Sequence, residues 1–387
     1  MAKWRLVGTA LGVFVLGFAS RAAAIGFTTI DLHPGGFSAS DAFSVSGGQQ
    51  VGVGGAPGPI EHALLWTGTP GSVVDLHPAG FDFSAATGVS GGDQVGYGLP
   101  TGSTTLNNTH ALLWTGTPGG VVDLHPSGFD GSIANGISGG QQVGYAGNSS
   151  LTNYHAMMWT GTAGSAVDLH PAGFDVSLAD GVSGNQIVGY GHPTGSANAH
   201  ALLWTRQTHF PFSVAVSDLH PVGFDTSVAA AVSGGQQVGS GLPAGTSLAH
   251  ALLWSGTAAS AMDLNPIGYA DSEARGISGG QQVGFGETLV AFDQHALLWM
   301  GSAASVVDLN AFLPAGFTEA KAFGIDASGD IVGIASGPAS GGHIHAFLWE
   351  PVAPVPEPSS LLLISTGLAG VGVACRSRRR VRRDLLD

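Results

Sequence analysis

The most regular feature of the chain is a short apolar segment that begins with histidine, ends with tryptophan and returns seven times between polar and glycine-rich stretches. It reads HALLW at residues 62, 110, 200, 250 and 295, HAMMW at 155 and HAFLW at 345. Short apolar runs between turn residues are typical of buried β-strands. Each copy is therefore predicted to be a strand.

Two further segments recur with the same period of 44 to 50 residues. One is DLHP at 31, 75, 123, 168 and 218, with DLNP at 263 and DLNA at 308. The other is SGGQQVG at 46, 138, 233 and 278, with SGGDQVG at 90, SGNQIVG at 183 and SGDIVG at 328. Insertions such as residues 206–212 fall between these motifs and never inside them, which is how strands and loops behave.

Each repeat is predicted to hold four strands. Segments such as 85–90 and 94–97 form a hairpin around Gly-Gly, and 62–66 and 72–77 form a second hairpin around a turn rich in Gly, Pro and Thr. Four strands in about 45 residues, repeated seven times, are typical of the blades of a β-propeller. We predict an all-β, seven-bladed propeller over residues 25–350, with a β-helix as the alternative.

The phase of the repeat also predicts how the ring closes. The connection after DLHP is longer than either hairpin turn, so we place the blade boundary there. Residues 28–32 then form a fourth strand without a blade, and residues 345–349 end a blade that lacks its fourth strand. We expect these two segments to pair, because closure removes unpaired sheet edges.

The repeated polar residues allow a functional and a structural interpretation. Residues two apart in a strand share a face, so His62 lies with Trp66, and Asp75 lies with His77, which resembles a metal or acid–base site. However, a ring distributes such sets around its circumference, and buried polar groups need hydrogen bonds in any case. We therefore predict no catalytic, cofactor or metal residue, and a structural set of His62, Trp66, Asp75, His110, Trp114, Asp123, His155, Trp159, Asp168, His200, Trp204, Asp218, His250, Trp254, Asp263, His295, Trp299, Asp308, His345 and Trp349.

Residues outside the repeated motifs are the better place to look for a site. The aspartates of the GFD segments are expected to cap turns, with weak calcium binding as the alternative; they are Asp82, Asp130, Asp175 and Asp225. Asp326 and Asp330 are expected in a hairpin turn. A site that breaks the symmetry is expected in the loops 99–109, 146–154 and 335–344, or near the unrepeated His192, His209 and His343.

Charge is distributed unevenly along the chain. Residues 25–375 carry three Lys and Arg against 24 Asp and Glu, a net charge of −21. Such a body repels nucleic acid and anionic lipid surfaces, so neither is expected as a partner. The single cysteine, Cys375, excludes a disulfide within the chain.

The N-terminal residues 1–24 have the pattern of a secretory signal peptide. Lys3 and Arg5 precede an apolar run at 6–19, and Ala22 and Ala24 supply the small residues of a cleavage site. Cleavage is predicted after Ala24, with an uncleaved anchor helix as the alternative.

The C-terminus combines a Pro-rich linker (351–360), an apolar helix predicted to span the membrane (361–375) and a basic cytoplasmic tail (376–387). The order of Pro356-Glu357-Pro358, apolar run and arginine cluster resembles a PEP-CTERM sorting signal. The resemblance implies recognition of that motif by an inner-membrane exosortase, removal of the tail, and release to the cell surface, often alongside exopolysaccharide. An ordinary C-terminal anchor is the alternative.

The HALLW and HAFLW segments, together with the glycine segments GISGGQQVG at 276–284 and GIDASGDIVG at 324–333, resemble the bacterial extracellular HAF-type repeat. That resemblance implies a secreted repeat protein with no established activity.

These features predict an exported, noncatalytic protein of the cell surface or extracellular matrix that needs no cofactor. Exosortase would process it, and the membrane would hold it through the C-terminal helix before processing. Surface polysaccharide or another envelope protein would be its partner. The alternative is an enzyme that acts on extracellular glycans at the mouth of the propeller. A cluster of carboxylates at that mouth would favour the enzyme, whereas near-identical residues around it would favour a scaffold.

Overall fold

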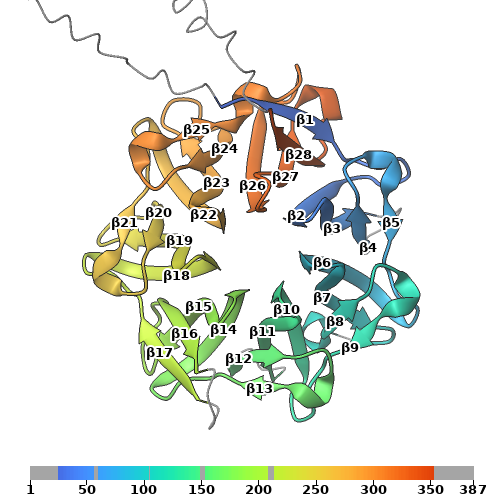
Figure 1. The fold of residues 1–387 in the computed structure, drawn as a ribbon, viewed down its shortest axis with the longest axis vertical. Coiled ribbons are helices and arrows are strands. Elements are labelled where there is room, and N and C mark those ends of the chain that lie inside the picture. The colour runs from blue at the N-terminus through green and yellow to red at the C-terminus, as the bar shows by residue number, and fades with distance from the viewer. Residues whose placement is uncertain (1–24, 56–59, 104, 149–152, 208–212, 353–387) are drawn as a thin grey trace, which may run out of the picture. The chain divides into compact units, whose positions relative to one another are not determined.

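Seven four-stranded antiparallel sheets are arranged around a central axis, each with its first strand innermost and its fourth outermost (Figure 1). The computed structural model describes residues 25–55, 60–103, 105–148, 153–207 and 213–352. The predicted seven-bladed all-β propeller is thereby confirmed. The predicted signal peptide with Ala24, the Pro356-Glu357-Pro358 motif, the C-terminal helix and the basic tail lie outside the described residues.

The first three blades are β2 (Ser40–Ser46), β3 (Gln49–Gly55), β4 (Glu61–Trp66) and β5 (Val74–Asp75); β6 (Phe81–Ser90), β7 (Asp93–Pro100), β8 (His110–Trp114) and β9 (Val122–Asp123); and β10 (Gly131–Ser138), β11 (Gln141–Gly147), β12 (Tyr154–Trp159) and β13 (Val167–Asp168). The next three are β14 (Phe174–Ser183), β15 (Gln186–Pro193), β16 (His200–Arg206) and β17 (Val214–Asp218); β18 (Phe224–Ser233), β19 (Gln236–Pro243), β20 (His250–Trp254) and β21 (Met262–Asp263); and β22 (Tyr269–Ser278), β23 (Gln281–Thr288), β24 (Gln294–Trp299) and β25 (Val307–Asp308). The closing blade consists of β26 (Glu319–Ile325), β27 (Ile331–Ser336), β28 (His345–Pro351) and β1 (Phe27–Asp31).

Helical structure in the described residues is limited to short 3₁₀ turns: η1 (Pro70–Ser72), η2 (Leu106–Asn108), η3 (Pro118–Gly120), η4 (Ala163–Ser165), η5 (Ala258–Ser260), η6 (Ala303–Ser305), η7 (Leu309–Phe312) and η8 (Pro338–Ser340). Within the part of the chain that the structure describes, no helix has the length and apolar character needed to cross a bilayer.

The two ends of the ring meet as the repeat phase predicts. Strand β1 pairs antiparallel with β28, with Thr28 opposite Glu350 and Asp31 opposite Phe347. The ladder continues one residue further, because the backbone N–H of Leu32 donates to the carbonyl of Ala346 over 2.8 Å. The closing blade therefore joins segments from opposite ends of the chain (Figure 1).

In five of the seven blades the outermost strand has only two residues, fewer than predicted from the sequence. In place of a strand over residues 72–77, β5 covers only Val74–Asp75, and Pro70–Ser72 forms the 3₁₀ turn η1. The hydroxyl of Ser72 accepts from the N–H of Thr67 and donates to the carbonyl of Thr69, which favours a tight turn over extension. Pro78 follows shortly and has no N–H to continue the ladder.

The core is divided among the seven interfaces between blades. Each hydrophobic cluster combines side chains of two neighbouring blades, as where Val143, Met158 and Leu169 meet Ile187 and Trp204. All seven motif tryptophans are fully buried. The indole of Trp204 donates to the carbonyl of Leu169 in the preceding blade over 2.9 Å. The ring is therefore held by contacts that no blade makes alone.

The second glutamine of the QQVG motif links the two turns at one end of a blade. In the blade of β6 to β9, Gln94 accepts from the N–H of Gly116 and donates to the carbonyl of Gly92. The blade of β14 to β17 has Ile187 at this position. There Arg206, from the inserted segment, donates to the carbonyl of Gly184 in the same turn; Gly184 is the equivalent of Gly91.

Candidate functional site

The repeated histidines and aspartates form a hydrogen-bond network on the outer part of each blade boundary. His155 Nδ1 lies 2.7 Å from Asp168 Oδ2, and the other carboxylate oxygen accepts from the N–H of His170 over 2.8 Å. His170 Nδ1 lies 2.8 Å from Ser177 Oγ, which also accepts from the N–H of Ala156 over 3.0 Å. Ser177 lies in β14, the inner strand of the next blade. The network therefore links one blade to its neighbour.

The same pairing recurs around the ring with Nδ1–Oδ2 distances of 2.7 to 2.8 Å, in His62–Asp75, His110–Asp123, His200–Asp218, His250–Asp263, His295–Asp308 and His345–Asp31. The two histidines of a unit also stack, as where the rings of His62 and His77 lie 4.1 Å apart. Among the described residues, no group of three or more His, Cys, Asp or Glu side chains is arranged to hold a metal ion. The contacts favour a structural role, because protein groups occupy both oxygens of each of these carboxylates.

Five histidines of the DLHP segments have lowered pKa values. Burial lowers the pKa of His77 below its usual value of about 6.5, and the neighbouring His62 lowers it further. Asp75 and Asp82 oppose this shift only in part. The pKa is lowered in the same direction for His33, His125, His170 and His220.

Replacing these five histidines by asparagine should reduce the acid sensitivity of the fold. A lowered pKa means that the folded protein binds fewer protons than the unfolded chain. Because of these histidines, the wild-type protein loses stability as the pH falls from about 7.5 through 6.5. Asparagine fits the position, since Asn265 accepts a 2.8 Å hydrogen bond from Ser272 in another blade. Urea unfolding at pH 7.5 and 5.0 should show the variant gaining stability relative to the wild type at the lower pH.

The variant also isolates an opposing effect. Asp41 and Asp180 have pKa values raised to about 6 and about 7, chiefly by desolvation. Such carboxyl groups favour folding as the pH falls, so the variant without these five histidines should itself become more stable between pH 7.5 and 5.0. A variant with the same acid sensitivity as the wild type would contradict the assignment of neutral histidines.

Three GFD aspartates stand second in the inner strands β6, β14 and β18, and their side chains cap the facing turns. Asp82, Asp175 and Asp225 each accept from the N–H of a glycine in the facing turn, at 2.9 to 3.3 Å. Asp326 accepts from the N–H groups of Ser328 and Asp330, so the 326–330 segment is a hairpin turn. Backbone donors thus occupy these carboxylates.

The two unrepeated histidines within the described residues, His192 and His343, are not brought together. His192 lies in β15, where its Nδ1 is 3.1 Å from the carbonyl of Ala197. His343 follows η8 in the closing blade, and His209 lies outside the described residues. The loops 99–109 and 146–154 are described only in part. Symmetry is broken more clearly elsewhere, on the innermost strands.

Every inner strand contains a β-bulge at the same place, and the extra residue points to the centre of the ring. An example is the register shift between Ala179 and Gly181, which leaves Asp180 without a cross-strand partner. A bulge redirects a side chain out of the regular ladder. All seven extra residues line one central channel; they are Phe43, Thr87, Asn135, Asp180, Ala230, Arg275 and Phe323.

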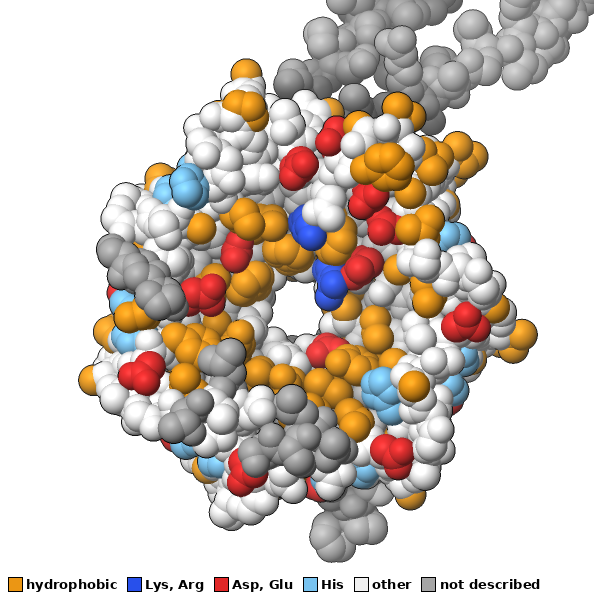
Figure 2. All heavy atoms as spheres, turned by 180° about the vertical axis from the view of Figure 1, so that it is seen from behind, with side chains coloured by type: hydrophobic (Ala, Val, Ile, Leu, Met, Phe, Trp, Pro, Cys, Tyr) orange, Lys and Arg blue, Asp and Glu red, His pale blue; other side chains and the backbone are white. Residues whose placement is uncertain are grey.

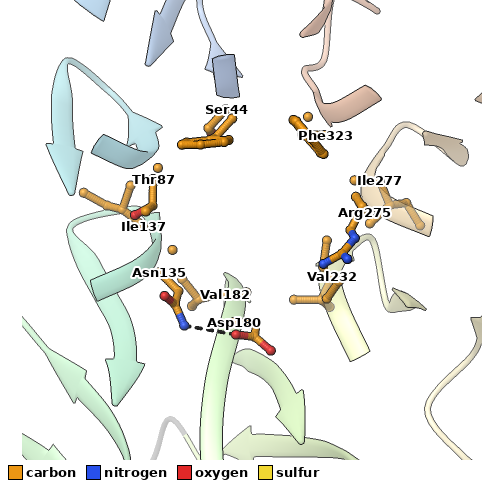
Figure 3. Close-up of a pocket in the computed structure, with 18 of the residues that line it drawn as sticks. Ser44, Thr87, Asn135, Ile137, Asp180, Val182, Val232, Arg275, Ile277 and Phe323 are labelled. Atoms are coloured by element: carbon orange, nitrogen blue, oxygen red, sulfur yellow. Dashed lines mark hydrogen bonds between the residues drawn. The ribbon is translucent and has the colours of Figure 1, made fainter. Parts of the chain in front are cut away.

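These bulge residues differ although their neighbours are nearly constant. The preceding residue is alanine in all seven blades, the following one is Gly, Ala or Ser, and the next is Val or Ile. The channel is therefore layered: a variable ring lies beside a ring of small residues and an aliphatic ring that includes Val182, Val232 and Ile277 (Figure 3). Its volume of about 650 Å³ is within the usual range for small-ligand sites.

The variable ring is electrostatically asymmetric. Asn135 donates to Asp180 Oδ1 over 3.0 Å, while Arg275 projects from a different part of the wall (Figure 3). Asp180 is half-buried, and desolvation raises its pKa to about 7 against the opposing effects of Arg275 and of the Asn135 hydrogen bond. Arg275 also forms an ion pair with Glu273. Thr87 uses its hydroxyl to donate to the carbonyl of Ala134.

A second variable tier lies next to the ring, on the strands β7, β11, β15 and β23. It holds Tyr97, Tyr145, Tyr190 and Phe285, each opposite the residue two positions before a bulge. The guanidinium of Arg275 lies 5.6 Å from the centre of the Phe285 ring, and Lys321 Nζ lies 4.6 Å from it. Figure 2 shows Lys and Arg side chains at the edge of the central opening, with hydrophobic and acidic side chains beside them.

These channel residues were not predicted, although the sequence contains a signal for them. Aligning the seven inner-strand segments places one variable residue between an invariant alanine and a small residue. The repeated polar motifs are the more conspicuous pattern. The bulge that turns this residue to the channel is visible only in the strand register.

Comparisons with known proteins identify one sequence feature. Residues 354–380 match the PEP-CTERM protein-sorting motif. No curated protein matches the chain. The match confirms the sorting signal predicted at the C-terminus, which implies export and processing by an exosortase; the HAF-type repeat is not confirmed.

Two solved structures resemble the chain in fold. Oligopeptidase B from Leishmania major has 11% sequence identity and a TM-score of 0.47, over 81% of this chain and 49% of that one. A structure from a study of two prolyl endopeptidases has 12% identity and a TM-score of 0.49, over 83% of this chain and 51% of that one. The chain thus spans about half the length of the proteins to which it is similar.

Proposed function

We propose that this protein is a noncatalytic binding protein of the bacterial cell envelope, displayed after exosortase processing, with its ligand in envelope polysaccharide or in another envelope protein. One observation supports binding above all. The residues that break the sevenfold repeat are concentrated at the channel, where a ligand of limited size fits, whereas the repeated polar set is engaged in the scaffold.

The composition of the channel favours binding over glycan hydrolysis. Most glycoside hydrolases need two carboxyl groups about 5 to 10 Å apart. Among the described residues that line the channel, Asp180 is the one carboxylate. Its pKa of about 7 would suit a general acid, and this keeps the enzyme as the second candidate. Release of new reducing ends from an exopolysaccharide by the purified protein would overturn the noncatalytic assignment.

Replacing Pro356, Glu357 and Pro358 together by alanine tests the sorting part of the proposal. The variant should stay membrane-bound and unprocessed, because the exosortase would lack its recognition motif. Surface labelling of cells and the electrophoretic size of the protein measure both effects, and we expect at least a tenfold loss of surface protein if recognition loses about 1.4 kcal/mol or more.

The matched control is Pro354→Ala, which removes a proline just before the motif and should leave display unchanged. Display of the triple variant at the wild-type level would argue against exosortase processing.

A further inference from the structure

Two of the few Lys and Arg side chains of the propeller lie close together. The described residues contain three Lys and Arg, namely Arg206, Arg275 and Lys321. Arg206 is committed to the carbonyl of Gly184 in an outer turn. The other two belong to adjacent blades and share the ring of Phe285. A body with a net charge of −21 over residues 25–375 thus places two positive charges together at its channel.

Lys321 is available to a ligand. Arg275 has Glu273 as an ion-pair partner, but Lys321 makes no ion pair with any described residue. Its ammonium group rests 4.6 Å from the centre of the Phe285 ring, and the side chain is half-buried. A cation held in this way retains its hydrogen-bond donors for an incoming anion, and carboxylate oxygens are among the strongest acceptors for such groups.

The opposite arc of the mouth is aromatic. Tyr97, Tyr145 and Tyr190 come from three consecutive blades, and Tyr190 lines the channel itself. Burial raises the pKa of Tyr145, and the neighbouring Tyr154, Tyr190, Tyr97 and Asp180 raise it further. The three rings are half-buried, and their hydroxyl groups have no hydrogen-bond partner among the described residues. Each ring therefore offers an apolar face together with a free hydroxyl group.

We infer that the channel mouth binds a short saccharide chain bearing carboxylate groups, with Lys321 and Arg275 on the carboxylate and the three tyrosines against the sugar rings. Sugar rings combine apolar faces with many hydroxyl groups, which is the complement of half-buried tyrosines. A carboxylate is the partner that Lys321 lacks, since Arg275 already has Glu273. The inference rests on the proposed binding function and specifies its site and ligand class.

Two tetrasaccharides of equal length provide the test: one of galacturonic acid, and its counterpart with every carboxylate reduced to an alcohol. Calorimetric titration of the purified full chain should show binding of the acidic probe at least about tenfold tighter than the neutral one. Lys321→Gln should abolish most of that difference while leaving the affinity for the neutral probe unchanged. Tyr145→Phe with Tyr190→Phe should weaken both probes by about tenfold.

Tyr269→Phe is the matched control. Tyr269 lies away from the channel lining, against His295, and six equivalent positions in the other blades carry phenylalanine. This variant should bind both probes like the wild type. Phe285 shows that phenylalanine is also accepted at the position of the three mouth tyrosines.

Three outcomes would overturn the inference. They are equal binding of the acidic and neutral probes, unchanged binding by the Lys321 and tyrosine variants, and binding of tetraglutamate at the same site as tightly as the acidic saccharide. Each leaves the sorting proposal intact, because surface display depends on residues 356–358 and is measured separately.

Discussion

Replacing Gly144 by alanine should destabilise the protein by about 3 kcal/mol or more. A Cβ atom at this position would lie 1.9 Å from the carbonyl oxygen of Ile133 and 2.9 Å from Ala134 Cα. Both are backbone atoms of the neighbouring inner strand, so no side-chain rotation can relieve the overlap. The bulge at residues 134–136 brings the two strands this close. Urea unfolding of the purified full chain measures the loss.

Gly164→Ala is the matched control in the same blade. A Cβ atom there would have no heavy atom within 4 Å, and the equivalent residues Ala259 and Ala304 already carry one. This change should be neutral or should stabilise by up to about 1 kcal/mol, because alanine restricts the unfolded chain. If both variants unfold at the same urea concentration, close approach does not explain the glycine of the QVG motif.

The QVG glycine has the same surroundings in every blade. At Gly52, Gly96, Gly189, Gly239, Gly284 and Gly333, a Cβ atom would lie 1.8 to 2.0 Å from a carbonyl oxygen of the inner strand. The repeated glycine is therefore a requirement of the bulge that directs the channel residues inward. The motif and the variable ring are two consequences of one backbone feature.

Replacing Ile30 by proline should open the ring. The N–H of Leu32 donates to β28, and the alternation of an antiparallel ladder directs the N–H of Ile30 to the same side. Proline removes that donor and costs about 3 kcal/mol or more within regular structure. Loss of β1 would also uncover Leu32, which is fully buried. We expect a lower urea midpoint and the appearance of oligomers, because β28 would become an exposed edge.

Ile30→Ala separates closure from side-chain packing. It keeps the N–H group and removes only the partly buried side chain that packs against the cluster of Leu64 and Trp66. This variant should lose part of the stability and remain monomeric by light scattering. Equal stability and equal mass of the two variants would show that β1 does not hold the ring closed.

The architecture was predictable because the repeat is strong and local. The period of HALLW, DLHP and the glycine motif predicts seven blades, and the orphan segments at 28–32 and 345–349 predict closure through β1 and β28. The fourth strand was predicted too long, because the side chain of Ser72 and the position of Pro78 decide where extension ends.

The channel site was not predictable in the same way. His62 and Asp75 attract attention as chemical groups, but they bind one another and the backbone. Asp180 and Arg275 occur once each in unremarkable segments, and 95 residues separate them in the chain. Only the ring brings them to one cavity.

By itself, the sequence determined the number of blades, the closure of the ring, the acidic body and the C-terminal sorting signal. Each of these features follows from a contiguous or periodic pattern of residues. The tertiary structure decided which single residue of each repeat faces the channel. That choice depends on a one-residue bulge, since the direction of a strand side chain alternates and one extra residue reverses it. The residues that distinguish one blade from another thereby meet at the centre, away from the repeated histidines and aspartates of the outer network.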